Sequence, residues 1–200
     1  MKLVFATHNR GKLVEVKALL GDIGVEVVSS EEAGVTEEPI EDGATFEVNA
    51  LKKALETSQK THEWSVADDS GICIEALGGE PGVYSKRWAG EDADDQKIIE
   101  YTLQKMKNVP EGRRQATFES SVALVTPSGE YWLFNGTIQG KLAASPHGRN
   151  LPGLCYDVLF IPEGESRTFG EMSAEEKNAL SHRGRAFRQL KEFLAKQSLL

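Results

Sequence analysis

Hydrophobic and polar positions follow one another along the chain in a pattern that predicts strands and helices in alternation. The apolar run from Lys2 to Ala6 is typical of a short buried strand, and a polar turn follows it as far as Gly11. From Lys12 to Leu20 apolar side chains recur at helical spacing, and the segment 25–28 then predicts a second strand. A strand, a polar loop, a helix and a strand in this order indicate the beginning of an α/β protein.

The same patterns continue over the rest of the chain. Helical periodicity returns at 45–57 behind the capping residue Thr45, at 94–107, in a short helix capped by Ser173, and at 183–196. Strands are predicted at 64–67 and 72–74, interrupted by the acidic turn 68–71, then in the hairpin 117–125 and 131–138, and at 156–161. The sequence contains neither a repeat nor a long linker, so we expect residues 1–200 to form a single domain.

Composition and charge narrow the classes of function. A formal net charge of −8 argues against the broad basic surface that a protein coating nucleic acid needs, but it allows a small polyanion bound by local cations and a metal ion. Cys73 and Cys155 lie far apart and predict neither a disulfide framework nor a zinc cluster. The initial apolar run is too short for a signal peptide, and no segment approaches the roughly 20 apolar residues of a membrane helix. We therefore expect a cytoplasmic protein that does not bind membranes.

The turn 7–12 lies between a predicted strand and a predicted helix, and its side chains suit an anion. Backbone N–H groups at a helix N-terminus are unpaired, so they stabilise a phosphate group there. Thr7, Asn9 and Lys12 add a hydroxyl, an amide and an ammonium group. The alternative is a polar turn in which Thr7 or Asn9 only caps the helix, and the GxxxxGK[ST] pattern of a P-loop is absent.

An acidic loop precedes the second predicted helix. Glu38, Glu41 and Asp42 lie in this loop, and the helix carries Lys52 and Lys53. Carboxylate oxygens are natural ligands of Mg²⁺, which keeps several waters in proteins. The loop is therefore a candidate metal site, with an ordinary solvated acidic loop as the alternative.

Two aspartates directly follow the predicted strand 64–67. Ligands of α/β proteins bind at strand ends, and adjacent like charges cost energy unless a cation offsets them. Asp68 and Asp69 therefore predict a cation site with Ser70 as a donor to phosphate, unless Asp68 serves only as a structural cap.

Basic side chains gather again before the last predicted helix. Lys177 and Arg183 carry hydrogen-bond donors only, which suits phosphate oxygens or a carbonyl group such as purine O6. Alternatively, Ser181 simply caps the helix that follows it. The basic turn, the acidic loop, the paired aspartates and this late basic cluster together predict a magnesium–triphosphate site.

These segments, in this order, resemble the inosine triphosphate pyrophosphatase family, also called XTP/dITP diphosphatases. The matching motifs extend over nearly the whole chain, at 6–12 with Glu15, 41–46, 49–50, 67–71, 76–79, 81–85, 176–178 and 181–183. The resemblance implies an elongated α/β domain with a central mixed sheet and two lobes that flank a nucleotide cleft. It also implies a homodimer.

The resemblance further implies roles for single residues. Glu41 and Asp69 are expected to hold Mg²⁺, and Asp69 is also the expected proton acceptor for the attacking water. The turn after the first strand and Lys53 are expected to hold the phosphates. The residues expected to bind substrate are Thr7, His8, Asn9, Arg10, Gly11, Lys12, Lys53, Ser70, Leu154, Cys155, Tyr156, Asp157, Lys177, His182 and Arg183.

One segment departs from the family, which usually has Phe-Gly-Tyr/Trp-Asp-Pro where this chain has Leu-Cys-Tyr-Asp-Val at 154–158. Tyr156 and Asp157 are kept, but Leu154 replaces the aromatic side chain that is expected to stack on the base. The departure concerns base affinity and selectivity, and it leaves the phosphate chemistry unchanged.

The activity implied by the resemblance is hydrolysis of ITP, dITP and XTP to the monophosphate and pyrophosphate, which keeps deaminated purines out of DNA and RNA. Lys177 or Arg183 would face O6 of the base and Asp157 would face N1–H, so that adenine, with the reverse polarity, leaves buried groups unpaired. Two alternatives are a pyrophosphatase for other modified nucleotides and a nucleotide-sensing module without turnover.

Overall fold

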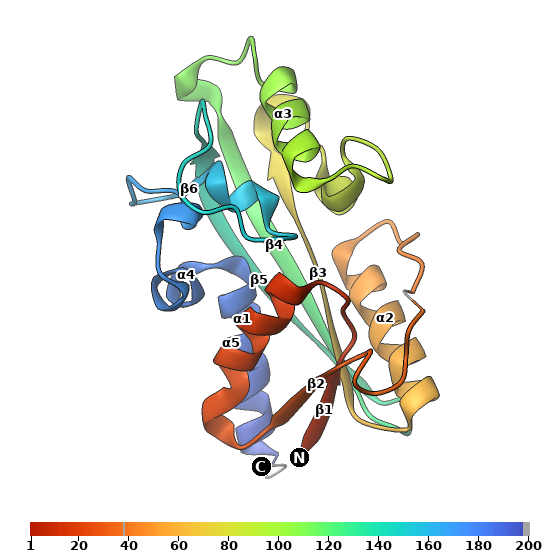
Figure 1. Ribbon diagram of the computed structural model, residues 1–200. Helices are drawn as coiled ribbons and strands as arrows, with labels where there is room; N and C mark the ends of the chain where they lie inside the picture. Colours follow the sequence, from red (N-terminus) through yellow and green to blue (C-terminus); the bar gives the residue numbers. More distant parts are fainter. Residues whose placement is uncertain (38, 198–200) are drawn as a thin grey trace.

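One mixed sheet of six strands runs through the molecule, with helices on both of its faces (Figure 1). The computed structural model describes residues 1–37 and 39–197. The strands are β1 (Lys2–Phe5), β2 (Glu26–Ser29), β3 (Ser65–Ile74), β4 (Gln115–Val125), β5 (Tyr131–Leu142) and β6 (Phe160–Pro162). The helices are α1 (Arg10–Leu20), α2 (Phe46–Thr61), α3 (Asp95–Lys105), α4 (Ala174–Leu180) and α5 (His182–Lys196).

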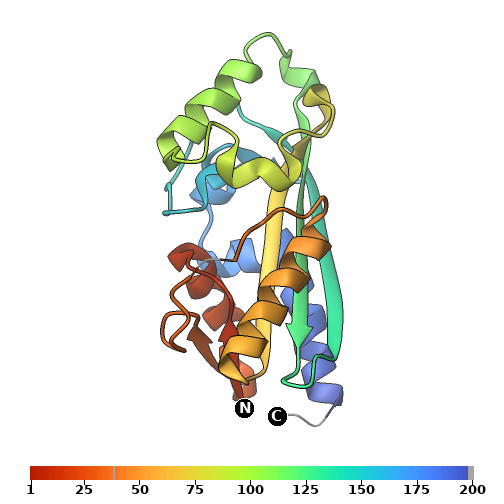
Figure 2. The ribbon, with the colours of Figure 1, turned by 90° about the vertical axis from the view of Figure 1, so that its right-hand side faces the viewer.

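The strand order explains the long shape of the molecule. The order is β2-β1-β3-β4-β5-β6, in which β1 pairs in parallel with β2 and β3, and the pairs from β3 to β6 are antiparallel. The strands β3, β4 and β5 have 10, 11 and 12 residues and extend along the whole molecule (Figure 2). The expected elongated α/β fold with a central mixed sheet is therefore confirmed.

Two helices cover opposite faces of β4. Because successive side chains of a strand point to opposite faces, Val122 and Leu124 pack in one cluster with residues of α5, and Ala123 and Val125 pack in another with Ala50 and Ala54 of α2. The site residues that α2 and α5 carry therefore approach the sheet from its two sides.

Two hydrophobic cores divide the molecule into lobes along the sheet. One core contains Ile72 and Ile74 of β3 with residues of α3 and β6, and the other contains Val66 of the same strand with residues of β1, α1 and α5. The middle of β3, where Asp68 and Asp69 lie, joins the two lobes. Within the described residues, no helix combines the length and the apolar character needed to cross a membrane.

Helix starts follow the predicted capping chemistry. Thr45 accepts a hydrogen bond from the backbone N–H of Val48, and Ser173 forms a capping box at the start of α4. Ser181 accepts from the backbone N–H of Gly184 and thereby caps α5. The structural role considered for Ser181 is thus confirmed, and His182 and Arg183 directly follow this cap.

Two predictions for the strands were wrong. The predicted acidic turn at 68–71 is part of the uninterrupted strand β3, which pairs with β4 along its full length because both aspartates find polar partners inside the protein. The predicted strand 156–161 is a 3-10 helix, Cys155–Val158, followed by the three residues of β6. Its side chains other than Asp157 are apolar, and a helical turn buries them in the core that contains α3 and β6 as well as a strand does.

Candidate active site

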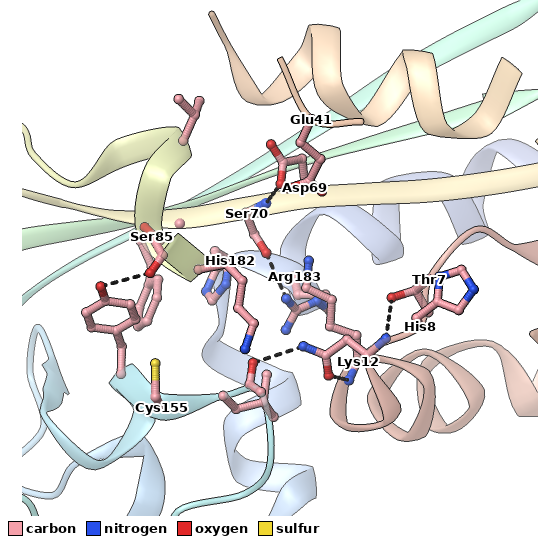
Figure 3. A pocket seen from close by; sticks show the side chains of 18 of the residues that line it. Thr7, His8, Lys12, Glu41, Asp69, Ser70, Ser85, Cys155, His182 and Arg183 are labelled. Atoms are coloured by element: carbon pink, nitrogen blue, oxygen red, sulfur yellow. Dashed lines mark hydrogen bonds between the residues drawn. The ribbon is translucent and has the colours of Figure 1, made fainter. Parts of the chain in front are cut away.

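A pocket lies beside the middle of β3, between the two lobes (Figure 3). Its walls come from the turn before α1, the loop before α2, the 3-10 helix Gly82–Arg87, the segment 153–157 and the start of α5. The predicted site residues that line it are Thr7, His8, Asn9, Lys12, Glu41, Lys53, Asp69, Ser70, Leu154, Cys155, Tyr156, Asp157, His182 and Arg183. The structure thus brings together residues that are up to 176 positions apart in the sequence, from Thr7 to Arg183 (183 − 7).

Asn9 organises the turn between β1 and α1. Its Oδ1 accepts a hydrogen bond from the backbone N–H of Lys12 at 3.1 Å, so the helix begins at Arg10, two residues earlier than predicted. Thr7 Oγ1 accepts from the backbone N–H of Asn9 at 3.1 Å. The side chain of Lys12 lines the pocket, and the N-terminus of α1 lies beside it, which is the expected setting for an anion.

Three predicted residues do not line the pocket. Arg10 is exposed at the start of α1, and Lys177 is buried outside the pocket wall. Gly11 lies beneath the segment 152–154, where a Cβ atom would be 2.8 Å from the carbonyl oxygen of Pro152 and 3.1 Å from Leu154. A glycine at this position therefore allows the close approach of that segment to the turn.

Lys53 of α2 connects the two carboxylates expected to bind metal. Its Nζ bonds to Glu41 and lies 3.6 Å from Asp69 Oδ1, and Asn49 Nδ2 donates to Asp69 Oδ2 at 2.9 Å. Burial raises the pKa of Asp69, and the Glu41 charge raises it further, although Lys53 opposes both. For Glu41, burial is outweighed by Lys53 and the pKa is lowered. Asp69 is consequently the stronger base of the two.

These two carboxylates fit a magnesium ion. Figure 3 shows the Glu41 and Asp69 side chains together at one side of the pocket, close enough for the Glu41 charge to raise the pKa of Asp69. Mg²⁺ takes one or two carboxylates from a protein and completes its shell with water and substrate phosphates. The described part of the chain has no group of three or more His, Cys, Asp or Glu suited to a metal, so the other ligands would come from phosphate and water.

Asp42 of the same loop is not part of this arrangement. Asp42 is exposed and pairs with Lys52, with 2.7 Å between Oδ1 and Nζ. Glu38 lies outside the described residues.

Asp68 is the counter-ion of two cations, a role that the sequence did not indicate. Its Oδ2 lies 3.1 Å from Lys12 Nζ and accepts from Arg183 Nε at 3.0 Å and from Ser70 Oγ at 3.1 Å. Burial raises the pKa of Asp68, but Lys12 and Arg183 outweigh it and hold this pKa well below the usual range. Asp68 therefore remains ionised and fixes both cations at the pocket.

Glu15 of α1 extends this network to the residues around Asp157. Lys177 Nζ donates to Glu15 Oε1 at 2.6 Å and also bonds to Asp157, while Arg183 pairs with the other oxygen of Glu15. Burial raises the pKa of Asp157, and Lys177 opposes that shift. Lys177 thus contacts Asp157 from outside the pocket, where it favours the ionised form of that carboxylate.

Aromatic side chains form the wall opposite the charged turn. The His182 ring stacks on Phe118 with 4.4 Å between centroids and 9° between planes, and Tyr156 packs edge-on against the same ring. Burial lowers the pKa of His182 well below its usual value, and Arg183 lowers it further, so this ring is neutral. Burial also raises the pKa of the Cys155 thiol to about 12, which keeps it protonated. The wall is therefore uncharged and suits a planar base.

Several lining residues had no role assigned from the sequence. They are Ala6, Pro39, Gly71, Val83, Ser85, Lys86, Phe118 and Gly153. The motif at 81–85 was a signal for Val83 and Ser85. Phe118 had none, because in the sequence it is one apolar residue of a strand, and only pairing with Ile72 of β3 brings it to the site.

Comparisons with known proteins find one family, and the match extends over nearly the whole chain. The model of the Ham1 family matches residues 3–193. A dITP/XTP pyrophosphatase of Leuconostoc mesenteroides is 46% identical over 194 residues, which is 95% of this chain and 94% of that protein. One of Bacillus subtilis is 41% identical over 191 residues, covering 96% of each chain.

Solved structures agree with this result. The Staphylococcus aureus Ham1 protein superposes with a TM-score of 0.84 at 34% identity, covering 98% of this chain and 100% of the other. A nucleoside-triphosphatase / dITP/XTP pyrophosphatase from Mycobacterium abscessus gives a TM-score of 0.74 at 44% identity, covering 95% of this chain and 98% of the other. The sequence match, the shared fold and the shared extent agree: this chain belongs to the Ham1 family.

Proposed function

We propose that this protein hydrolyses deaminated purine nucleoside triphosphates, namely ITP, dITP and XTP, to the nucleoside monophosphate and pyrophosphate. The observation that carries the proposal is the pocket itself, which joins a cationic turn and two carboxylates to an uncharged aromatic wall. Relatives named dITP/XTP pyrophosphatases cover almost the whole chain at 41–46% identity, which supports the same substrate class. The activity would remove damaged nucleotides from the cytoplasmic pool.

The reaction begins with attack of water on the α-phosphorus. The water oxygen forms a bond to phosphorus, the bond to the bridging oxygen of the β-phosphate breaks, and pyrophosphate leaves with that electron pair. Asp69 accepts the proton of the water, and its raised pKa suits this task. Glu41 and Asp69 would hold Mg²⁺, which supplies neutralisation of phosphate charge and acidifies the bound water.

The leaving group is stabilised from the turn before α1. Lys12 lines the pocket with its ammonium group, and the unpaired N–H groups at the start of α1 add partial positive charge. Lys53 lies between Glu41 and Asp69 and sets the spacing of the two carboxylates. Asp68 pairs with both Lys12 and Arg183 and so holds these two cations in place.

Selectivity for the base follows from hydrogen-bond polarity. Asp157 faces N1–H of hypoxanthine or xanthine as an acceptor, and Arg183 is the donor to O6, since Lys177 lies behind Asp157. Adenine presents an amino group and an unprotonated N1, which would leave both residues unpaired in a buried site. Discrimination by unpaired polar groups is large compared with discrimination by size.

The protein also acts as a homodimer in this proposal. Tyr131 and Leu133 lie on the same face of β5 and leave 53% and 39% of their surface exposed, which gives an apolar area for a second copy. Sedimentation of the purified chain measures the oligomeric state, and a monomer at micromolar concentration would contradict this part.

The test of the proposed activity is a product assay over a panel of nucleoside triphosphates with Mg²⁺. We expect pyrophosphate from ITP, dITP and XTP, much less from ATP, and no turnover after chelation of the metal. Orthophosphate as the first product would indicate attack at the γ-phosphorus and refute the mechanism. Preference for modified pyrimidines would indicate a related pyrophosphatase, and binding without turnover would indicate a nucleotide-sensing module.

A further inference from the structure

The backbone of Gly153 is held from both lobes at once, through its N–H and its carbonyl group. Its N–H donates to Asp95 Oδ2 at 2.6 Å, and Asp95 is the first residue of α3, in the lobe that contains β6. Its carbonyl oxygen accepts from Asn9 Nδ2 at 3.0 Å, and Asn9 belongs to the turn between β1 and α1, in the other lobe. One residue therefore connects the phosphate side of the pocket to the opposite lobe.

The local geometry of Gly153 depends on these contacts. Its φ is +77°, a region that favours glycine, and a Cβ atom would lie 2.4 Å from Asn9 Nδ2. Asn9 is itself fixed in orientation, because its Oδ1 caps α1 while its Nδ2 donates to Gly153. The segment cannot shift along either lobe without breaking one of the two hydrogen bonds.

The position of Gly153 determines where the segment 154–157 lies in the pocket. The next four residues, Leu154 to Asp157, all line the pocket and include the carboxylate that reads the base. Asp95 is free to hold this segment because the helix cap is supplied by Asp94, whose Oδ1 accepts from the backbone N–H of Lys97. The Asp95 side chain is 18% exposed, and its nearest cation, Lys86 Nζ, is 3.7 Å away.

We propose that Asp95 is a positioning residue for base recognition, which acts by holding the Gly153 N–H and so setting the segment 154–157 against the base. The inference rests on the proposed function for its substrate, but the contact itself does not. Asp95 does not line the pocket; through Gly153 it determines how well Asp157 meets N1–H. Loss of the bond loosens the segment 154–157, while the hydrogen bond from Asn9 to Gly153 and the Asp69 side chain are left in place.

The test compares Asp95→Ala with Asp95→Asn. The amide of Asp95→Asn still offers an oxygen to the Gly153 N–H, so we expect near wild-type values. In Asp95→Ala this hydrogen bond to a charged acceptor is lost, and KM for ITP should rise about tenfold with little change in kcat. The ratio of kcat/KM for ITP over ATP should fall by a similar factor.

Asp94→Ala is the matched control on the same helix. It removes the N-cap of α3 and should lower the melting temperature while KM for ITP stays unchanged. If Asp95→Ala behaves like Asp94→Ala, Asp95 is only structural and the proposal is wrong. If Asp95→Asn is as impaired as Asp95→Ala, the charge matters rather than the hydrogen bond, which also refutes it.

A second measurement needs no substrate. Amide hydrogen exchange in the peptide spanning 151–158 should be faster in Asp95→Ala than in the wild type and in Asp95→Asn. Unchanged exchange would refute the positioning role whatever the activity is. If the wild-type protein releases no pyrophosphate from ITP, the proposed function fails, and the exchange result still decides whether Asp95 holds the segment.

Discussion

Two adjacent aspartates illustrate how much a single residue depends on the face it occupies. Asp68 and Asp69 are neighbours in β3 and so point to opposite faces of the sheet. Asp68 meets Lys12 of α1 and Arg183 of α5, and their charges hold its pKa far below normal. Asp69 lies toward α2, where burial and the nearby Glu41 raise its pKa. The first is therefore a permanent counter-ion, and the second is available to accept a proton.

The change Asp69→Asn tests that division at the level of one residue. We expect kcat to fall by about 100- to 10,000-fold, because the proposed general base is lost together with a proposed anionic metal ligand. The amide keeps the shape and its contact with Asn49, so the melting temperature should change little. Steady-state pyrophosphate release and thermal melting measure both effects, with Asp42→Asn in the exposed loop as the control. Near-normal kcat would mean that another group is the base.

Leu154 is the residue at which the resemblance predicts a departure of this chain from its family. Its side chain is buried, lines the pocket and also packs beside Gly11. Phenylalanine would add a π-face, and since leucine already supplies part of the about 1–3 kcal/mol of base stacking, we expect a gain of about 1 kcal/mol. Leu154→Phe should therefore lower KM for ITP about fivefold with little change in kcat.

The control for that change is Leu151→Phe, because Leu151 is in the same segment but exposed. An unchanged KM together with a lower melting temperature for Leu154→Phe would mean that the ring overpacks against the turn instead of reaching the base.

At the scale of elements, the site depends on how closely α5 approaches the sheet. Gly136 of β5 lies directly under the start of this helix, where a Cβ atom would be 2.1 Å from the carbonyl oxygen of His182 and 2.7 Å from the backbone nitrogen of Ala186. Backbone meets backbone here, so neither side has a flexible atom that could give way. His182 and Arg183 reach the pocket because the first turn of α5 rests on this glycine.

Gly136→Ala should consequently impair stability and activity together. Overpacking of this kind costs about 1–3 kcal/mol, which is about 2–12 °C in melting temperature for a chain of this size. kcat/KM for ITP should fall as well, because the helix start that carries His182 and Arg183 must move. Differential scanning calorimetry and pyrophosphate release measure the two effects. Gly112→Ala, at a position with open space around it, should change neither; a fully active Gly136→Ala protein would contradict the argument.

At the scale of the whole molecule, the pocket lies between two hydrophobic cores that share one sheet. The phosphate turn belongs to the lobe of β1 and α1, and the aromatic wall belongs to the lobe of α3 and β6. A bound nucleotide would touch both lobes. Its binding energy therefore adds to the stability of the entire chain. The cations at the pocket make this possible for an anionic ligand although the protein as a whole carries a charge of −8.

Ligand-dependent melting of the Asp69→Asn protein tests this arrangement without turnover. ITP at about 100 times its Kd should stabilise the fold by about 2.7 kcal/mol, or about 5–11 °C. ATP at the same concentration should give a clearly smaller shift, since its base leaves Asp157 unpaired. Pyrophosphate alone separates binding at the phosphate turn from binding of the base. Equal shifts with ITP and ATP would show that the pocket does not read the base.

The sequence by itself determined the helices, most of the strands, the caps and the segments that carry chemistry. These features depend on residues within a few positions of one another, such as Asn9 with Lys12 or Thr45 with Val48. The motif order also indicated the family, which the comparisons confirm. Local periodicity and local hydrogen bonding are enough for such predictions.

Only the tertiary structure decided where the charged and aromatic groups go. Whether Asp68 and Asp69 break a strand depends on Lys12 and Arg183, which lie far away in the sequence and offset the cost of burying the charge. Phe118 enters the site through strand pairing, and Lys177 lies behind Asp157 because Glu15 holds it there. The free energy of a buried charge is set by partners in space, and a pattern along the chain does not contain them.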